Sequence, residues 1–393
     1  MRVKKMKKIC PRCSNEDPDL FYEGSKGWYC RACVKFSRRL LSEIHYENWD
    51  DFPSDLSADV HLDFELTDLQ KEISKSIPEK MKTGDVLVWA VTGAGKTELC
   101  MDFISQCLKQ RKRIAVVIAR RQVVLELAER FKKSFQCHVT PLCEGYTDDL
   151  TGDLIVCTAH QCYRFFDKKF DHIIVDEPDA FPYHGNAVLQ GIVRNSCKGS
   201  MLYLTATPDS QLLENCQILR LFSRPHGYDL PVPVIKRSGK ITGLIYLWNW
   251  CIKRQKLKIP FLVFVPKIEM ANHINALFKM ALNVEVCTSK TEMKDEIIQR
   301  MKKRELSGLV CTTVLERGVT FEGVDVCVFH ADHPVFTSAS LIQIAGRVGR
   351  KTSRPTGDCL FLTFYQSDEV IESVRLIEYA NHQKMSVLSE TTL

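Results

Sequence analysis

The chain reads Thr92-Gly93-Ala94-Gly95-Lys96-Thr97 directly after the apolar run Val86–Val91, and an amphipathic stretch follows. This order predicts a buried strand, a glycine-rich loop and a helix. Glycines let backbone N–H groups surround phosphate oxygens, and the N-terminus of the helix adds positive potential. The pattern therefore predicts an α/β lobe that binds the phosphates of a nucleotide through residues 92–97.

Two side chains of this loop have predicted roles. Lys96 is expected to reach the β- and γ-phosphates of ATP, and Thr97 is expected to ligate Mg²⁺. Ala90 stands where the eight-residue pattern has its first glycine. A glycine-rich turn with a solvated lysine is the structural alternative, and the strand and helix on either side argue against it.

A second apolar run, His172–Val175, ends in the acidic pair Asp176 and Glu177. A carboxylate at the end of a buried strand can hold Mg²⁺, and its neighbour can polarise an attacking water. We assign magnesium binding to Asp176 and water activation to Glu177. Two adjacent acids often form only a solvated turn, but their place after an apolar strand and after the phosphate loop favours catalysis.

A third candidate segment, near the C-terminus, reads Q-I-A-G-R-V-G-R over residues 343–350. Guanidinium groups supplied by a second lobe can neutralise charge that develops on a γ-phosphate. We therefore predict catalytic roles for Gln343, Arg347 and Arg350. The alternative is an Arg-rich helix face in solvent, for which the two glycines would be poor choices.

Apolar runs alternate with helical patterns through most of the chain, which predicts parallel sheets with crossover helices. The predicted fold class is α/β, with two lobes behind a small N-terminal module. We expect the module and its linker at 1–59, the ATP-binding lobe at 60–225 and the second lobe at 226–393, with a proline-rich linker at Ser223–Pro233. The predicted strands are Val86–Val91, Ile114–Ala119, Leu154–Thr158, His172–Val175, Met201–Thr205, Phe261–Val265, Val284–Cys287, Leu309–Thr312, Val326–Phe329 and Cys359–Phe364.

The N-terminal module carries two C-x₂-C pairs, separated by residues 14–29. Each pair can present two thiolates to a tetrahedral Zn²⁺ ion, so the predicted ligands are Cys10, Cys13, Cys30 and Cys33. The flanking Lys, Arg, Asp and Gly residues could not build a core around four buried cysteines. Aromatic and basic residues in the module fit binding of single-stranded DNA, and docking to a protein fits equally well. The lysines among residues 4–8 are expected to form a solvated tail.

Composition limits the class of protein. The chain has 393 residues, a formal net charge of +6 and 17 cysteines. This length predicts two or three domains, the charge permits a nucleic-acid partner, and the odd cysteine number favours buried thiols in a reducing cytoplasm. No apolar run approaches the ~20 residues that span a bilayer, so we expect neither a transmembrane segment nor a secretory signal.

Together these motifs resemble the superfamily 2 helicases and translocases, which are P-loop NTPases with two RecA-like lobes. Residues 176–179 (D-E-P-D) resemble the family's acidic box, and residues 205–207 (T-A-T) resemble the element that couples hydrolysis to lobe movement. Gln70 resembles an adenine-reading glutamine, and residues 312–320 resemble a motif of the second lobe. By the same resemblance, the residues that contact nucleic acid are Arg120, Thr158, Gln161, Thr312 and Thr313. For Thr158, a role as a helix N-cap is the structural alternative.

The closest resemblance is to the ComFA-type late-competence ATPases. It rests on the four-cysteine module and on three stretches: D-E-P-D-A-F-P at 176–182, L-E-R-G-V-T-F at 315–321 and A-D-H-P-V-F at 331–336. It implies an ATP hydrolase that drives imported single-stranded DNA into the cytoplasm, with ATP, Mg²⁺ and Zn²⁺ as cofactors. It also implies a cytoplasmic protein at the inner face of the cell membrane, beside the competence DNA channel and a phosphoribosyltransferase-like competence protein.

Two alternatives stay open. A replication-restart or RNA helicase would share the motifs of the superfamily, although the restart helicase carries its zinc sites inside the core rather than ahead of it. The alternative from a different class is a zinc-anchored DNA-binding scaffold, whose ATPase core switches conformation without acting as a motor. Competent residues at every catalytic position argue against the scaffold.

Overall fold

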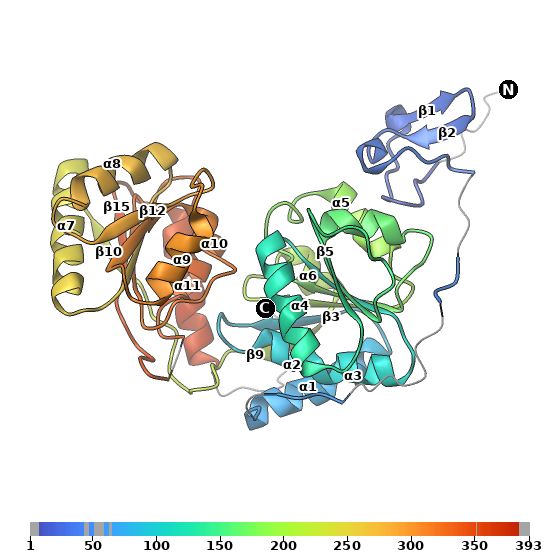
Figure 1. Ribbon diagram of the computed structural model, residues 1–393, viewed down its shortest axis with the longest axis horizontal. Helices are drawn as coiled ribbons and strands as arrows, with labels where there is room; N and C mark the ends of the chain where they lie inside the picture. Colours follow the sequence, from blue (N-terminus) through green and yellow to red (C-terminus); the bar gives the residue numbers. More distant parts are fainter. Residues whose placement is uncertain (1–7, 43–46, 51–58, 63–64, 351, 385–393) are drawn as a thin grey trace. The chain divides into compact units, whose positions relative to one another are not determined.

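The computed structural model divides into two compact units by its internal contacts (Figure 1). The first unit is Met1–Trp89 with Lys96–Arg220, and the second is Ala90–Gly95 with Leu221–Leu393. The four-cysteine module therefore belongs to the first unit. The domain boundaries expected from the sequence stay predictions, and the tail expected among residues 4–8 lies almost entirely outside the described residues. The structure describes residues 8–42, 47–50, 59–62, 65–350 and 352–384.

A seven-stranded sheet forms the centre of the first unit, in the order β5-β6-β4-β7-β8-β3-β9. The pairs from β5 through β3 are parallel, and the inner strands are buried because helices cover both faces. The strands are β3 (Val86–Ala90), β4 (Ile114–Ile118), β5 (Val139–Leu142), β6 (Leu154–Thr158), β7 (His172–Asp176), β8 (Met201–Thr205) and β9 (Gln217–Leu221). The helices are α1 (Asp68–Met81), α2 (Lys96–Leu99), α3 (Met101–Lys109), α4 (Arg121–Ser134), η3 (Ala159–Phe165), α5 (Ala187–Asn195) and α6 (Ser210–Asn215).

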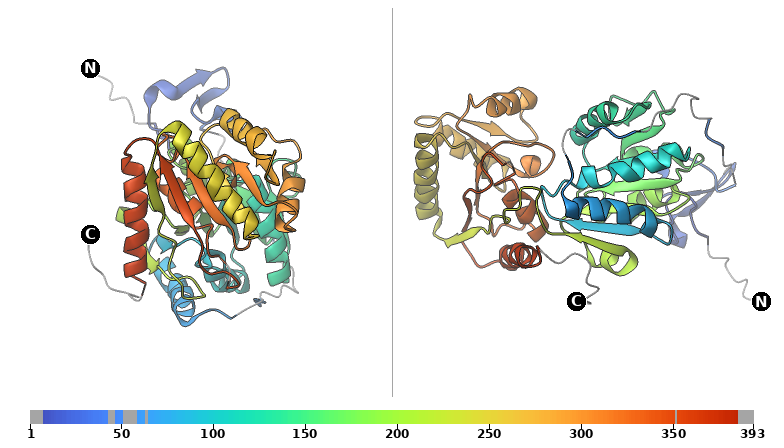
Figure 2. Two further views of the ribbon diagram at one scale, coloured as in Figure 1. Left: turned by 90° about the vertical axis from the view of Figure 1, so that its left-hand side faces the viewer. Right: turned by 90° about the horizontal axis from the view of Figure 1, so that it is seen from below.

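The second unit has a six-stranded parallel sheet in the order β10-β15-β14-β11-β13-β12. Apolar residues of α7 and α8 cover one face of this sheet (Figure 2). The strands are β10 (Val234–Arg237), β11 (Phe261–Phe264), β12 (Val284–Cys287), β13 (Gly308–Cys311), β14 (Asp325–Phe329) and β15 (Cys359–Thr363). The helices are α7 (Lys240–Lys256), α8 (Ile268–Phe278), α9 (Lys294–Lys302), η4 (Thr313–Leu315), α10 (Ser338–Ala345) and α11 (Asp368–His382).

The N-terminal module is built on a small antiparallel hairpin. Strands β1 (Phe21–Gly24) and β2 (Gly27–Cys30) pair around a two-residue turn, and two single-turn helices flank them. These are η1 (Pro18–Leu20) and η2 (Val34–Phe36). The hairpin places Cys30 at the end of β2, where it can meet the other three cysteines.

The predicted α/β class and the ten predicted strands are confirmed, with strand ends that differ by at most one residue. Strands β1, β2, β5, β9 and β10 were not predicted. Each of these lies at a sheet edge or in the small hairpin, and all of them except β5 are largely in contact with water. Strand β10 is exposed along its whole length, and β5 contains Pro141. A search for continuous apolar runs misses such strands because solvent-facing positions do not require apolar residues.

Across the described helices, none reaches the combination of length and hydrophobicity that a bilayer-spanning segment requires.

A buried carboxylate joins three parts of the second unit. Asp325 is 1% exposed and accepts hydrogen bonds from Arg254 Nε at 3.2 Å, Arg354 Nη2 at 2.6 Å and the backbone N of Asp358 at 3.0 Å. We expect Asp325→Ala to destabilise the protein by about 3–5 kcal/mol, because buried Arg254 would lose its buried counter-charge and keep only its pair with the more exposed Asp358. A guanidinium chloride titration measures this, with exposed Glu292→Ala as the control. Equal midpoints in the two variants would contradict the expectation.

Candidate nucleotide, zinc and nucleic-acid sites

The predicted order of strand, glycine loop and helix is present. Gly93 and Gly95 have φ values of +82° and +81°, a conformation that glycine adopts without strain. Lys96 and Thr97 form the first turn of α2 and are partly exposed, so both side chains stand at a helix N-terminus. Ala90, which stands in place of the pattern's first glycine, is the buried last residue of β3. The phosphate-binding roles of residues 92–97 stay predictions.

The acidic pair lies at the same edge of the sheet as the phosphate loop. Strand β7 ends at Asp176, and β8 lies between β7 and β3 with parallel pairing to each. Because the carboxyl ends of parallel strands lie at one edge of the sheet, Asp176 and the end of β3 lie at the same edge. Glu177 has a φ of +54°, and its backbone N donates to Leu204 O at 2.9 Å. This strained backbone turns the chain out of the sheet directly at the predicted catalytic residue.

A hydrogen-bond network joins the acidic box to the end of β8. Asp179 accepts from Thr205 Oγ1 at 2.6 Å and from Thr207 Oγ1 at 2.8 Å, one hydroxyl on each carboxylate oxygen. The backbone N of Thr207 donates to Thr205 Oγ1 at 3.0 Å, which closes the network. The sequence analysis noted both segments but gave Asp179 no role. The sequence feature that could have indicated this role is the position of Asp179 as the last acid of the D-E-P-D box.

Gln70 has a structural function in addition to its predicted one. Its Oε1 accepts from Thr67 N at 2.9 Å, while Thr67 Oγ1 accepts from Gln70 N at 3.3 Å. This reciprocal pair is a capping box that begins α1, and Gln70 is 1% exposed. The adenine-reading role of Gln70 stays a prediction.

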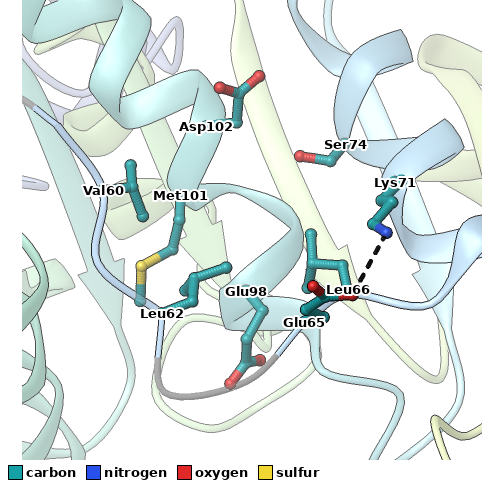
Figure 3. Close-up of a pocket in the computed structure, with 9 residues that line it drawn as sticks. All are labelled: Val60, Leu62, Glu65, Leu66, Lys71, Ser74, Glu98, Met101 and Asp102. Atoms are coloured by element: carbon teal, nitrogen blue, oxygen red, sulfur yellow. Dashed lines mark ion pairs between the residues drawn. The ribbon is translucent and has the colours of Figure 1, made fainter.

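A pocket of about 610 Å³ opens beside this capping box (Figure 3). It lies between the segment before α1, α1 itself and the α2–α3 region, and Lys71 Nζ pairs with Glu65 across it at 4.0 Å. Neither Gln70 nor any residue of the phosphate loop lines the pocket. We therefore do not assign the nucleotide base to it. The lining residues are Val60, Leu62, Glu65, Leu66, Lys71, Ser74, Glu98, Met101 and Asp102.

The remaining predicted catalytic residues lie in the second unit, on and after α10. Gln343 is 2% exposed, and its Nε2 has no hydrogen-bond partner within the described part of the chain. Arg347 is 1% exposed and its Nε donates to Glu316 O at 3.2 Å. Arg350 Nε donates to Gly346 O at 3.0 Å. The structure gathers these three residues in one place, and their roles stay predictions.

Arg224 was missed by the sequence analysis. It is 2% exposed, and its Nη1 donates to Val348 O at 2.9 Å and to Gly349 O at 2.8 Å, while its Nε donates to Thr92 O at 3.0 Å. Burial and the nearby charge of Arg350 lower the pKa of Arg224 to about 9, so the guanidinium stays charged at neutral pH. It therefore fixes the backbone next to Arg347 and Arg350 within the second unit. An arginine in a proline-rich linker carries no sequence signal for this role.

The four cysteines of the module fit a zinc ion. All four Sγ atoms lie within 4.8 Å of one another, and the Cys10–Cys33 and Cys13–Cys30 Sγ distances are both 3.8 Å. Zinc–sulfur bonds of about 2.3 Å give a tetrahedron with edges of about 3.8 Å. All four cysteines are free thiols rather than disulfides. The donor set and its spacing are those of a structural zinc site.

A buried guanidinium supports this sulfur cluster. Arg12 is 5% exposed, and its Nε and Nη2 lie 3.3 and 3.1 Å from Cys33 Sγ. Its Nη2 also donates to Cys33 O at 2.6 Å and Ser37 O at 2.8 Å. The neighbouring thiols of Cys10 and Cys13, and then Arg12, lower the pKa of the Cys33 thiol and favour the thiolate that binds metal. Arg12 therefore offsets part of the negative charge of a four-thiolate site.

Three of the predicted nucleic-acid contacts lie at one edge of the first unit's sheet. Arg120 follows β4, Thr158 ends β6, and β4 pairs with β6. Thr158 stands at the N-cap position of η3 but its side chain makes no capping hydrogen bond, so the structure does not support the N-cap alternative. Gln161 lies within η3, whereas Thr312 and Thr313 lie at the start of η4 in the second unit. Their contacts with nucleic acid stay predictions.

We expect Arg12→Met to lower zinc affinity by about 10- to 100-fold, because partners of metal ligands have effects of this size. Competition with a chromophoric chelator measures the affinity. Arg31→Met is the matched control, since Arg31 lies between Cys30 and Cys33 as Arg12 lies between Cys10 and Cys13, but is exposed. Equal zinc affinity in both variants would show that the guanidinium does not support the site.

Comparisons with known proteins agree with this geometry. Residues 63–210 match the family model "Type III restriction enzyme, res subunit", and residues 241–352 match "Helicase conserved C-terminal domain". In solved structures, the DEAD-box helicase Mss116 bound to ssRNA and UDP-BeF aligns with a TM-score of 0.61 at 20% identity, over 83% of this chain and 76% of that one. S. cerevisiae Dbp5 bound to RNA and ADP BeF3 aligns with a TM-score of 0.60 at 14% identity, over 82% and 89%. These two structures share the two-lobed fold.

The curated relatives are more informative because they match nearly the full chain. Competence protein ComFA of Streptococcus pneumoniae is 33% identical over 98% of this chain and 92% of the relative. Competence protein ComFA of Bacillus subtilis is 31% identical over 96% and 87%. This chain therefore belongs to the ComFA family of competence proteins, with the ATP-hydrolysing core of a superfamily 2 helicase.

Proposed function

We propose that this protein is an ATP-driven single-stranded DNA translocase that draws transforming DNA into the cytoplasm. The observation that carries the proposal is the bonding of Asp179 to Thr205 and Thr207. It connects the acidic box to the segment after β8, so a change at the nucleotide can move that segment. Membership in the ComFA family supports competence as the setting.

The hydrolytic chemistry is assigned to residues of the first unit. Thr97 and Asp176 offer the oxygen ligands that Mg²⁺ prefers, and the ion, when bound, neutralises charge on the β- and γ-phosphates. Burial and then the charge of Asp176 raise the pKa of Cys100, which directly follows α2. Lys96 holds the phosphates, and Glu177 orients the attacking water and accepts its proton.

Three further residues are proposed to respond to the γ-phosphate. We assign this role to Gln343, Arg347 and Arg350, whose backbone is fixed in part by Arg224. The buried amide Gln343 Nε2, for which the described residues offer no hydrogen-bond partner, is suited to bind an oxygen of the nucleotide. In other NTPases, guanidinium groups near the γ-phosphate stabilise the charge that develops during phosphoryl transfer. They raise the rate of hydrolysis there by about 10³–10⁵-fold.

The substrate is assigned as the phosphodiester chain of single-stranded DNA. Its proposed contacts are Arg120, Thr158 and Gln161 in the first unit, with Thr312 and Thr313 in the second. We place the protein in the cytoplasm, at the inner face of the cell membrane beside the competence DNA channel. A phosphoribosyltransferase-like competence protein is the proposed companion. Family membership supports these assignments.

We expect Lys96→Ala and Glu177→Gln to reduce DNA-stimulated ATP hydrolysis at least about 100-fold, because each removes a group needed for phosphoryl transfer. Binding of single-stranded DNA should persist in both. A coupled assay of phosphate release measures turnover, and exposed Lys133→Ala is the control. Wild-type hydrolysis in both variants would reject the proposed site.

The same assay separates the alternatives when the wild-type protein is given single-stranded DNA, forked duplex or RNA. Stimulation by single-stranded DNA above the other two supports the translocase. A preference for forked duplex or RNA would support a restart or RNA helicase. Absence of stimulation by any nucleic acid would favour a switching scaffold.

Arg350→Ala is expected to lower turnover by about 10³-fold while ATP affinity changes much less, since its charge acts mainly on the transition state. Single-turnover hydrolysis and nucleotide binding by fluorescence measure the two effects separately. If ATP affinity and turnover fall by equal factors, Arg350 contributes to binding of ATP in the ground state and does not act mainly on the transition state.

A further inference from the structure

The zinc module is docked on the first lobe through a contact that only glycine permits. A Cβ added to Gly191, on α5, would lie 2.1 Å from the carbonyl oxygen of Cys13. One turn further along α5, Asn195 Nδ2 donates to Ser14 Oγ at 2.8 Å. The backbone of the first C-x₂-C pair therefore rests directly on α5, which Figure 1 shows beside the β1–β2 hairpin.

The other side of the module packs on η3. The ring of buried Phe36 lies 6.0 Å from the ring of His160 and 5.9 Å from that of Tyr163, between centroids. Arg39 forms an ion pair with Asp167, just after η3. These contacts hold the loop after β2 against the helix that carries Gln161.

The segment after the module is anchored beside the same helix. Trp49 stacks on Phe165 with ring centroids 5.6 Å apart, and its Nε1 donates to Lys169 O at 3.0 Å. A single hydrophobic cluster contains all four zinc-site cysteines together with residues of β6, η3 and α5. The module and the first lobe therefore share one core, and the module's position on η3 is fixed by packing.

Docking brings a lysine to the helix η3, which carries the predicted DNA contact Gln161. Lys35 is exposed, precedes Phe36, and its Nζ lies 5.2 Å from the Phe36 ring centroid. Burial and then the charge of Lys35 lower the pKa of His160, so the ammonium lies close to η3. On η3 itself, Arg164 Nε donates to Gln161 Oε1 at 2.7 Å. Lys35 therefore lies by the side of η3 that carries His160 and Tyr163, and Arg164 pairs with Gln161 on the same short helix.

Charge is also segregated along the module. The part of the module before β2 has mixed charge, whereas residues 31–39 after it carry only basic charges. The acids before β2 are Glu16, Asp17, Asp19 and Glu23, next to the basic residues Lys8, Arg12 and Lys26, and the charged residues after it are Arg31, Lys35, Arg38 and Arg39. The acidic group at the docking contact, Asp167, is paired with Arg39. The loop that meets η3 is therefore the basic part of the module, and such a loop attracts a phosphate backbone.

We propose that the docked zinc module extends the single-stranded DNA path of the first lobe, and that Lys35 binds a phosphate of the strand that contacts Thr158 and Gln161. This proposal rests on the proposed function. Lysine binds phosphate as a point charge without reading the base, which suits a translocase that must accept any sequence.

Lys35→Gln tests the contact through the salt dependence of DNA binding. Fluorescence anisotropy with a labelled oligo-dT strand gives the affinity at several salt concentrations. Loss of one phosphate contact on single-stranded DNA should reduce the slope of log affinity against log salt by about 0.7. Lys26→Gln removes the same charge from the turn between β1 and β2 and should leave the slope unchanged.

A second variant tests whether docking is required. Gly191→Val adds a side chain where Cys13 O approaches α5, so it should displace the module while leaving the four cysteines and η3 chemically intact. We expect zinc content and basal ATP hydrolysis to be retained. The slope of log affinity against log salt should fall as much as it does in Lys35→Gln. The double variant that combines Gly191→Val with Lys35→Gln should show no further fall.

The outcomes separate this proposal from the proposed function. If the wild type binds DNA and Lys35→Gln keeps the full slope, the extended path is rejected and the module is left as a protein-docking element. A slope that falls equally in Lys35→Gln and Lys26→Gln also rejects it, because the effect would then be general charge. A wild type that does not bind single-stranded DNA would reject the proposed function itself.

Discussion

Parallel pairing of β7 and β3 with the strand between them, β8, is the constraint on which the first unit depends. It places the phosphate loop, the acidic pair and the T-A-T segment at one edge, although 78 residues of sequence, 98–175, lie between the loop and the acids. Parallel strands leave their carboxyl ends on the same side, so no further device is needed to gather these segments. The Asp179 network then connects two of them by direct hydrogen bonds.

The zinc module packs against the ATPase lobe more extensively than a separately folded, appended domain would. Its cysteines share a hydrophobic cluster with β6, η3 and α5, and its backbone touches α5 at Gly191. Because a zinc site of this kind supplies folding free energy of its own, bound metal would stabilise the surface of η3 as well as the module. The segment that carries Gln161 is thereby braced from outside the RecA-like fold.

Much of the fold could be predicted from sequence because buried strands have an unmistakable composition. Strands such as Ile114–Ile118 and Val326–Phe329 are apolar throughout, since helices cover both faces of a parallel sheet. Edge strands such as Val234–Arg237 were missed because their side chains face water and need no apolar pattern. The four cysteines that the structure brings together were predicted as zinc ligands mainly from their spacing, because the two thiolates of each pair must reach one ion.

Local order along the chain thus determined the phosphate loop, the acidic box and the four metal ligands, since each depends on residues that are neighbours in sequence. Only the tertiary structure revealed the roles of Arg12, Asp179, Gly191 and Arg224. The partners cited for these residues lie at least 21 positions away in sequence. Burial of a guanidinium or close approach of two backbones follows from how elements pack, and packing has no signal in a short stretch of sequence. The reason is physical: these residues respond to surfaces that exist only after the sheets have formed.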